Sequence, residues 1–232
     1  MNIYSHLVTL PVSCSPYAAH GVIAPDLWPK FTRVYNSSRL NAGKMLSDPI
    51  VKDWMVGVQW HIHLDQHFHN LDTFHRACIS VTDDVQRYAE SLGWKRCHTI
   101  AHVWIELMLD GWLLNQQDVS SHWGETLSES YNTLVNRLIS HVPDLDLLDV
   151  YLQRLSWCKE SHHLSRPNQV KEQMFILDKI LPERLFCARF LEVDLGWASA
   201  LERRAKQDFG QDLCTWVTGC EKGFDTFSKG LG

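Results

Sequence analysis

Four histidines and two aspartates occupy one short stretch of the chain, residues 60–72. On an α-helix, where each residue advances by about 100°, two of these histidines and both aspartates would share one face. They are His61, Asp65, His69 and Asp72. His63 and His67 would point to the opposite side. Because imidazole nitrogens and carboxylate oxygens are common metal ligands, the spacing predicts a metal-binding face on this stretch.

A second polar stripe follows at intervals of four residues, on a segment whose other positions are strongly apolar. It consists of His98, His102, Glu106 and Asp110. An imidazole and a carboxylate one helical turn apart can bind one ion, or one can orient the other. Two such helices packed face to face could enclose one or two divalent ions. The mixed nitrogen and oxygen donors favour manganese, iron or zinc over magnesium.

A less specific interpretation stays open, since single His/Asp pairs at helical spacing usually lie on a surface or cap a helix. Under it the chain is a helical binding module with structural histidines and no catalytic activity. The remaining histidines without a spacing argument are treated as structural: His20, His122, His141, His162 and His163. The sequence contains no Gly-rich phosphate loop, no G-x-S-x-G and no H-E-x-x-H motif.

The elements that must position these residues are predicted to be helices throughout, because no stretch shows useful β-alternation. A short helix near residues 3–10 is followed by a loop, with Pro11, Pro16 and Gly21 as breakers. Asp48 and Pro49 begin a helix that runs to about Ile79. A helix capped at residues 82–84 ends near residue 93. Later helices are expected at residues 95–115, 120–143, 143–161, 168–181, 182–207, and from 211 onward.

The length of 232 residues suits a single all-α domain, a helical bundle spanning 1–232. Its metal-site half would be residues 1–115 and its helical C-terminal half residues 116–232. A net charge of −5 gives no drive toward nucleic acid or an anionic membrane. The start of the chain lacks a basic signal-peptide region, and no apolar run reaches membrane-spanning length. Seven cysteines without CxxC spacing indicate reduced thiols and a cytoplasmic location.

Four motifs in order resemble the acyl carrier protein phosphodiesterase family, an all-helical group distantly similar to HD-type metal phosphohydrolases. The chain opens with Met-Asn and a His-Leu at His6. A G-x-x-x-x-D pattern joins Gly21 to Asp26, and G-x-x-x-H-x-x-x-D follows at residues 57–65. The family's later D-x-x-x-D-H is replaced here by His102, Glu106 and Leu107. The resemblance covers roughly residues 1–115.

The resemblance implies an HD-domain-like arrangement and a divalent-metal site. Its ligands would be His6, Asp26, His61, Asp65, His102 and Glu106. His6 and Asp26 are implied by the resemblance alone. Asp65 or Asp26 would orient the attacking water, and a second group of residues would support the site: His69, Asp72, His98 and Asp110.

The implied reaction is hydrolysis of the phosphodiester that joins 4′-phosphopantetheine to holo-acyl carrier protein, a step in lipid metabolism. An acidic carrier would need a basic docking patch, although a solvated helical face explains the same residues equally well. They are Arg184, Arg189, Arg203, Arg204 and Lys206. The alternative substrate is a small phosphoester or a nucleotide.

Overall fold

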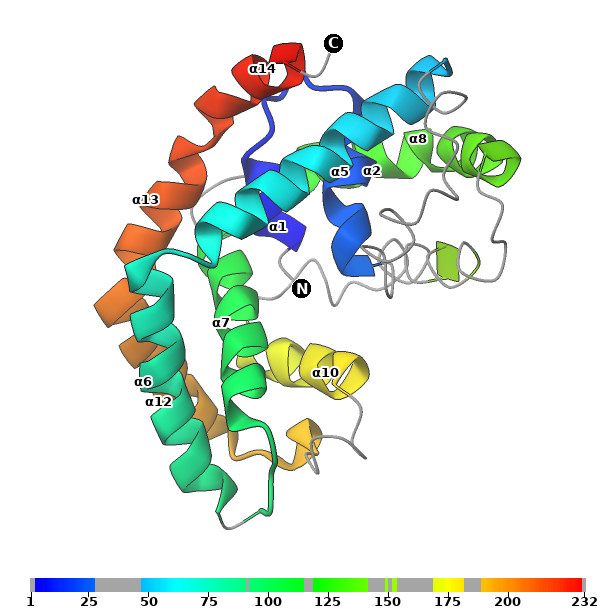
Figure 1. Ribbon diagram of the computed structural model, residues 1–232. Helices are drawn as coiled ribbons and strands as arrows, with labels where there is room; N and C mark the ends of the chain where they lie inside the picture. Colours follow the sequence, from blue (N-terminus) through cyan, green and yellow to red (C-terminus); the bar gives the residue numbers. More distant parts are fainter. Residues whose placement is uncertain are drawn as a thin grey trace. The chain divides into compact units, whose positions relative to one another are not determined.

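The computed structural model describes residues 3–27, 47–90, 92–114, 119–141, 149, 152–153, 169–181 and 189–230. Most of these residues are helical and none of them lies in a strand, so the all-α class is confirmed. The HD-like arrangement stays a prediction. The helices are α1 (Ile3–Val8), α2 (Pro16–Leu27), α5 (Pro49–Phe68), α6 (Asp72–Ala89), α7 (Cys97–Leu114), α8 (Val119–His141), α10 (Val170–Ile180), α12 (Leu195–Ala205), α13 (Gln211–Gly219) and α14 (Glu221–Gly230) (Figure 1).

The described chain forms two compact units, each assembled from separate stretches of sequence. Unit 1 contains residues 1–2, 67–117 and 163–216, and unit 2 contains residues 3–66, 118–162 and 217–232. Unit 1 therefore includes α6, α7, α10 and α12, and unit 2 includes α1, α2, α8, α14 and most of α5.

In unit 2, α1, α2 and α8 pack on one another, and α5 crosses α2 at two glycines. A Cβ atom on Gly21 would lie 2.0 Å from the carbonyl oxygen of Trp54, and one on Gly57 would lie 2.0 Å from that of Ala18. Real Cβ atoms cannot come so close to an oxygen, so the crossing requires glycine on both helices. His20 joins α2 to α8, with Nε2 lying 3.1 Å from the Leu127 carbonyl oxygen and 3.0 Å from Ser130 Oγ.

In unit 1, α6 and α7 lie side by side (Figure 1), and α10 and α12 pack against them. Tyr88 of α6 stacks on Trp197 of α12, with ring centroids 3.9 Å apart. Trp104 of α7 donates from Nε1 to Gln173 Oε1 of α10 at 2.9 Å. Large aromatic side chains thus fix α7, which carries the second polar stripe, among three neighbouring helices.

The predicted helix from Asp48 to about Ile79 begins as expected and then breaks. The Asp48 side chain caps α5 by accepting from the backbone N–H of Ile50 at 3.0 Å. At the other end, Asn70 and Leu71 donate backbone N–H groups three residues back, to His67 and Phe68. Such bonds tighten the last turn, and Leu71 is extended, so a new helix begins at Asp72. The prediction of one helix is wrong, and a single helical face does not carry both His69 and Asp72.

Two further boundary predictions are also wrong. Residues 82–84 do not begin a helix but lie inside α6, where Thr82 Oγ1 donates to the carbonyl oxygen of Cys78 at 2.6 Å. The loop expected after residue 10 contains α2, in which Pro16 is the first residue and Gly21 and Pro25 are internal. Pro16 fits the first turn because its missing N–H has no helical partner there.

The C-terminal predictions are confirmed in part. Helix α10 matches the helix expected at 168–181, and α8 matches the one at 120–143. The run expected at 182–207 is interrupted, because Asp194 accepts the backbone N–H of Trp197 at 2.6 Å and starts α12 afresh. Residues 182–188 and most of 143–161 lie outside the described residues. Among the helices described, none combines the length and the apolar character needed to cross a membrane.

Candidate metal-binding sites

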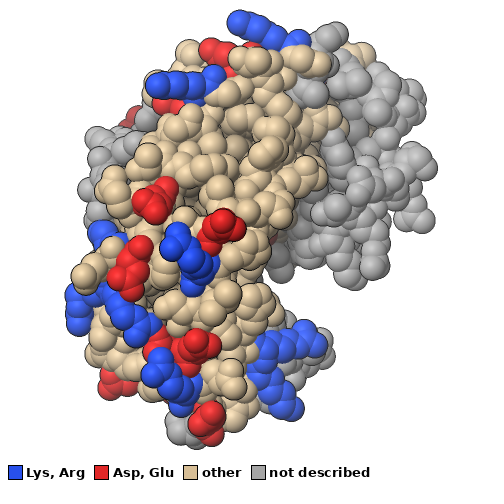
Figure 2. All heavy atoms as spheres, turned by 60° about the vertical axis from the view of Figure 1, so that its left-hand side comes forward, with Lys and Arg blue, Asp and Glu red and all other residues tan. Residues whose placement is uncertain are grey.

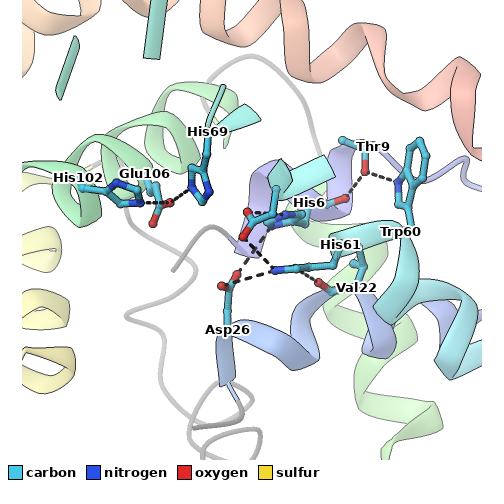
Figure 3. A network of polar contacts seen from close by, with 10 residues as sticks. His6, Thr9, Val22, Asp26, Trp60, His61, His69, His102 and Glu106 are labelled. Atoms are coloured by element: carbon cyan, nitrogen blue, oxygen red, sulfur yellow. Dashed lines mark hydrogen bonds and ion pairs between the residues drawn. The ribbon is translucent and has the colours of Figure 1, made fainter. Parts of the chain in front are cut away.

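The first cluster of potential ligands lies in unit 2 and combines three helices (Figure 3). His6 comes from α1, Asp26 from α2, and His61 and Asp65 from α5. The Asp65 carboxylate lies between the two imidazoles, with Oδ1 3.7 Å from His6 Nε2 and Oδ2 3.8 Å from His61 Nε2. Asp26 approaches from α2, with Oδ1 3.9 Å from His61 Nε2 and Oδ2 3.7 Å from His6 Nδ1.

His61 is oriented by the backbone of α2. Its Nδ1 donates to the carbonyl oxygen of Val22 at 2.7 Å, and a carbonyl oxygen can only accept. Nδ1 therefore carries a proton, and in the neutral ring the lone pair lies on Nε2, which faces the two carboxylates. A backbone hydrogen bond of this kind is a common way to fix a metal-binding histidine. The close crossing at Gly21 and Gly57 brings the Val22 carbonyl oxygen within hydrogen-bonding distance of His61.

His6 is held by its neighbours in the same unit. Its ring stacks on that of His61, with centroids 3.9 Å apart and planes inclined by 17°. The Thr9 hydroxyl donates to the His6 carbonyl oxygen at 2.6 Å and accepts from Trp60 Nε1 at 2.9 Å. Trp60 packs in turn against Phe224 of α14. This chain of contacts ties α1 to α5 next to the imidazoles.

These donor atoms lie farther apart than hydrogen-bond partners and slightly farther apart than two ligands of one ion. The four nitrogen–oxygen distances of 3.7–3.9 Å exceed hydrogen-bonding range. Two ligands about 2.1 Å from one ion at a tetrahedral angle would be about 3.4 Å apart, so small side-chain rotations would bring the atoms to that spacing. One ligand atom each from His6, His61 and Asp65 lies within 4.8 Å of the others. The group could hold a metal ion.

The second cluster lies in unit 1 and consists of His69, His102 and Glu106 (Figure 3). Both imidazole Nε2 atoms face one oxygen, Glu106 Oε1, at 3.0 Å from His69 and 3.1 Å from His102. Burial raises the pKa of the Glu106 carboxyl, but the hydrogen bonds from His102 and His69 are among the interactions that lower it. The net result is a pKa well below the usual range, so Glu106 is an anion. This group, too, could hold a metal ion.

The structure therefore distributes the predicted ligands between two clusters. His61 and Asp65 belong with the two residues that the family resemblance added, His6 and Asp26. His102 and Glu106 belong instead with His69, which the sequence had placed beside His61. The remaining supporting residues join neither cluster: Asp72 and His98 are exposed, and Asp110 is buried one turn beyond Glu106.

Sequence reasoning missed the backbone groups that position the first cluster. Every residue has a carbonyl oxygen, so the sequence does not indicate that the one on Val22 accepts a hydrogen bond from His61. Gly21 and Gly57 were visible in the sequence but were interpreted as a breaker and as part of a motif. A glycine four residues before His61, inside an otherwise unbroken helix, was the available signal for a close helix crossing.

Five of the seven cysteines lie among the described residues. Cys14, Cys78, Cys97, Cys214 and Cys220 are free thiols.

In the view of Figure 2, Lys and Arg side chains are interleaved with Asp and Glu. Arg204 pairs with Asp84, and Arg189 lies 3.2 Å from Glu192, so part of the expected patch is neutralised locally. Arg184 lies outside the described residues.

No protein-family model matches this chain, and no curated protein or solved structure matches it significantly.

Proposed function

We propose that the chain is a divalent-metal-dependent phosphodiester hydrolase that uses the first cluster. The observation that carries the proposal is the meeting of two imidazoles and two carboxylates from three helices, with His61 Nε2 directed at the carboxylates by the Val22 carbonyl. The order of the sequence motifs supports the choice of a phosphodiester, and it points to 4′-phosphopantetheine on holo-acyl carrier protein as the substrate.

The donor set guides the choice of cation. Imidazole nitrogen suits manganese, iron and zinc, whereas magnesium prefers an all-oxygen shell. A bound divalent cation supplies the positive charge that activates water and stabilises negative charge on phosphoryl oxygens. We expect His6, His61 and Asp65 to hold it, since their donor atoms already converge.

The two aspartates have different surroundings, which suggests different roles. Asp65 contacts both Nε2 atoms and its side chain is 34% exposed, so it can act as a ligand at the open side of the cluster. The Asp26 side chain is 18% exposed, and its two oxygens face different histidines. We assign Asp26 to orient the attacking water and to accept its proton. His6 would stabilise the Asp26 carboxylate through Nδ1, which lies 3.7 Å from Oδ2.

The test begins with metal-free protein reloaded with Mn²⁺ or Zn²⁺. Wild type should hydrolyse bis(p-nitrophenyl) phosphate, and kcat/KM should fall on the order of 100-fold or more in Asp65→Asn, because removal of a ligand costs at least as much as removal of a group that orients one. His67→Ala is the matched control, as His67 is exposed on the same helix and lies outside the cluster. It should behave as wild type.

The substrate is tested separately with holo-acyl carrier protein and with nucleotide monoesters. Release of 4′-phosphopantetheine from the carrier supports the proposed substrate, and activity on the small esters alone replaces it with the alternative. If the protein takes up no divalent ion by equilibrium dialysis, and Asp65→Asn and His61→Ala leave every activity unchanged, the hydrolase proposal is wrong and a binding module remains.

A further inference from the structure

The second cluster in unit 1 has features of a metal site in its own right. Its three residues come from two places in the sequence. His69 follows the end of α5, and His102 and Glu106 are one turn apart on α7. The donor atoms of all three lie within 4.8 Å of one another, and both imidazoles present the same nitrogen, Nε2, to the same carboxylate oxygen.

Two phenylalanine rings pack against the imidazoles of His69 and His102. Phe74 packs edge-on against His102, with ring centroids 5.1 Å apart and planes at 89°. It also lies 5.3 Å from the His69 ring, and Phe68 contacts both His69 and Phe74. The two imidazoles lie 4.8 Å apart with planes inclined by 48°. Rings fixed in this way lose little freedom when they bind an ion, and such preorganisation favours binding.

The cluster has a buried base and a solvent-accessible rim. The Glu106 side chain is only 7% exposed, whereas those of His69 and His102 are 33% and 32% exposed. The carboxylate is therefore buried, and the two imidazoles that face it are partly exposed. An ion entering from solvent would meet both histidines and would be neutralised by the carboxylate.

A hydrogen-bonded triad without metal is the competing explanation, since both Nε2–H groups can donate to Oε1. In a four-coordinate zinc site two ligand atoms about 2.1 Å from the ion are about 3.4 Å apart, so the separations of 3.0 and 3.1 Å would widen by a few tenths of an ångström when the ion binds. Two histidines and one glutamate are also the ligand set of a well-known kind of zinc site, in which a fourth position stays open to water or substrate.

We propose that His69, His102 and Glu106 form a zinc site within unit 1, with three protein ligands and a fourth position for water. This inference does not depend on the proposed function, because none of the three residues belongs to the hydrolytic cluster. Occupation requires each imidazole to carry its proton on Nδ1, so that both Nε2 lone pairs face the ion.

The stoichiometry of zinc binding to the full chain tests the proposal. Equilibrium dialysis with elemental analysis should give two equivalents of Zn²⁺ for wild type and one for Glu106→Gln. Glutamine keeps the shape of the side chain and one acceptor oxygen, so the variant retains a partner for the histidines. His98→Ala is the matched control, because His98 is an exposed histidine on the same helix, and it should retain two equivalents.

Cobalt provides a second readout that a purely structural role would not change. Co²⁺ in a four-coordinate site absorbs visible light much more strongly than six-coordinate Co²⁺. Wild type should show the bands of both clusters. Glu106→Gln and His102→Ala should lose the part of the intensity that Asp65→Asn retains. Retention of two equivalents and of the full spectrum in Glu106→Gln would overturn the proposal. So would a single wild-type equivalent that disappears in Asp65→Asn alone.

Discussion

At the scale of single residues, His20 shows how strongly burial controls a titratable group. The side chain is 1% exposed, and burial is the main cause that lowers its pKa to about 4, although the Leu127 carbonyl opposes the shift. Ser130 Oγ donates to the Thr126 carbonyl, so it accepts from His20 Nε2. The Nδ1 lone pair has no hydrogen-bond partner among the described residues. The folded protein therefore holds His20 neutral.

This arrangement predicts a pH-dependent loss of stability. The pKa of His20 is lower in the folded state than in the unfolded state, so below about pH 6.5 the unfolded chain takes up a proton that the folded chain refuses. The contribution is complete above that pH and is lost as the pH falls toward 4. Between about pH 7.5 and pH 4.5 it amounts to roughly 2–3 kcal/mol.

Urea unfolding at the two pH values measures this contribution. His20→Gln keeps a donor for Ser130 but cannot titrate. Its free energy of unfolding should therefore fall less on acidification than that of wild type, by roughly 2–3 kcal/mol. Groups in the metal clusters titrate in both proteins and cancel in the comparison. Equal pH dependence in the two proteins would show that His20 is not the group responsible.

The ligands themselves were predictable to different degrees. His61 and Asp65 are one turn apart on a helix, and His102 and Glu106 repeat the spacing, so local periodicity was sufficient for both pairs. It was not sufficient to pair His69 with His102. That pairing depends on the turn at Asn70, which tertiary packing selects and which residue type alone did not indicate.

At the scale of elements, the crossing of α2 and α5 determines whether the first cluster forms. Gly57→Ala would place a methyl group 2.0 Å from the Ala18 carbonyl oxygen. This oxygen belongs to the backbone of α2, so it cannot move aside as a flexible side chain could. The helices must separate, and we expect a loss of about 3 kcal/mol or more in the free energy of unfolding. Separation also carries His61 away from Val22, so Mn²⁺ affinity at the first cluster should fall.

Gly219→Ala is the matched control, since a Cβ atom there meets nothing within 4 Å among the described residues. It should leave both urea stability and Mn²⁺ affinity close to those of wild type. If Gly57→Ala is as stable as the control and binds Mn²⁺ equally well, the close crossing does not position the site.

Helix positions were predictable where local signals agreed with packing. The Asp48-Pro49 start of α5 and the long apolar run of α7 are examples, because capping and hydrophobicity act within a few residues. Helix α2 was missed because Pro16, Gly21 and Pro25 are breakers by local rules. Contacts with α5 and α8 stabilise the helix despite them, and the sequence gives no direct view of those contacts.

At the scale of the whole molecule, the chain builds two units from interleaved stretches, and each unit contains one ligand cluster. The division into a metal-site half, residues 1–115, and a C-terminal half, residues 116–232, stays a prediction. In the two units, α8 belongs with α1 and α2, and α10 and α12 belong with α6 and α7. Local patterns predict helices, but they do not show which distant helices share a core.

Separate clusters predict separate responses in amide hydrogen exchange. At a cation concentration about 100 times Kd, linkage stabilises the binding unit by about 2.7 kcal/mol and slows its globally controlled exchange about 100-fold. Zinc should therefore protect α2 in unit 2 and α7 in unit 1. Asp65→Asn should lose only the protection in α2, and Glu106→Gln only that in α7. Loss of both by either substitution would instead indicate one coupled site.

The close approach at Gly57 also fixes how α5 is rotated about its own axis, and therefore the direction of every side chain that follows on this helix. Counting from this residue, His61 returns to within about 40° of the contact direction and Asp65 to within about 80°. One residue inserted between positions 57 and 61 would rotate both groups by about 100°, and one inserted between 61 and 65 would rotate Asp65 alone, even if every side chain were preserved. Between positions 57 and 65, then, chain length is as strict a requirement as residue identity, and an insertion or deletion there should be less tolerable than most substitutions.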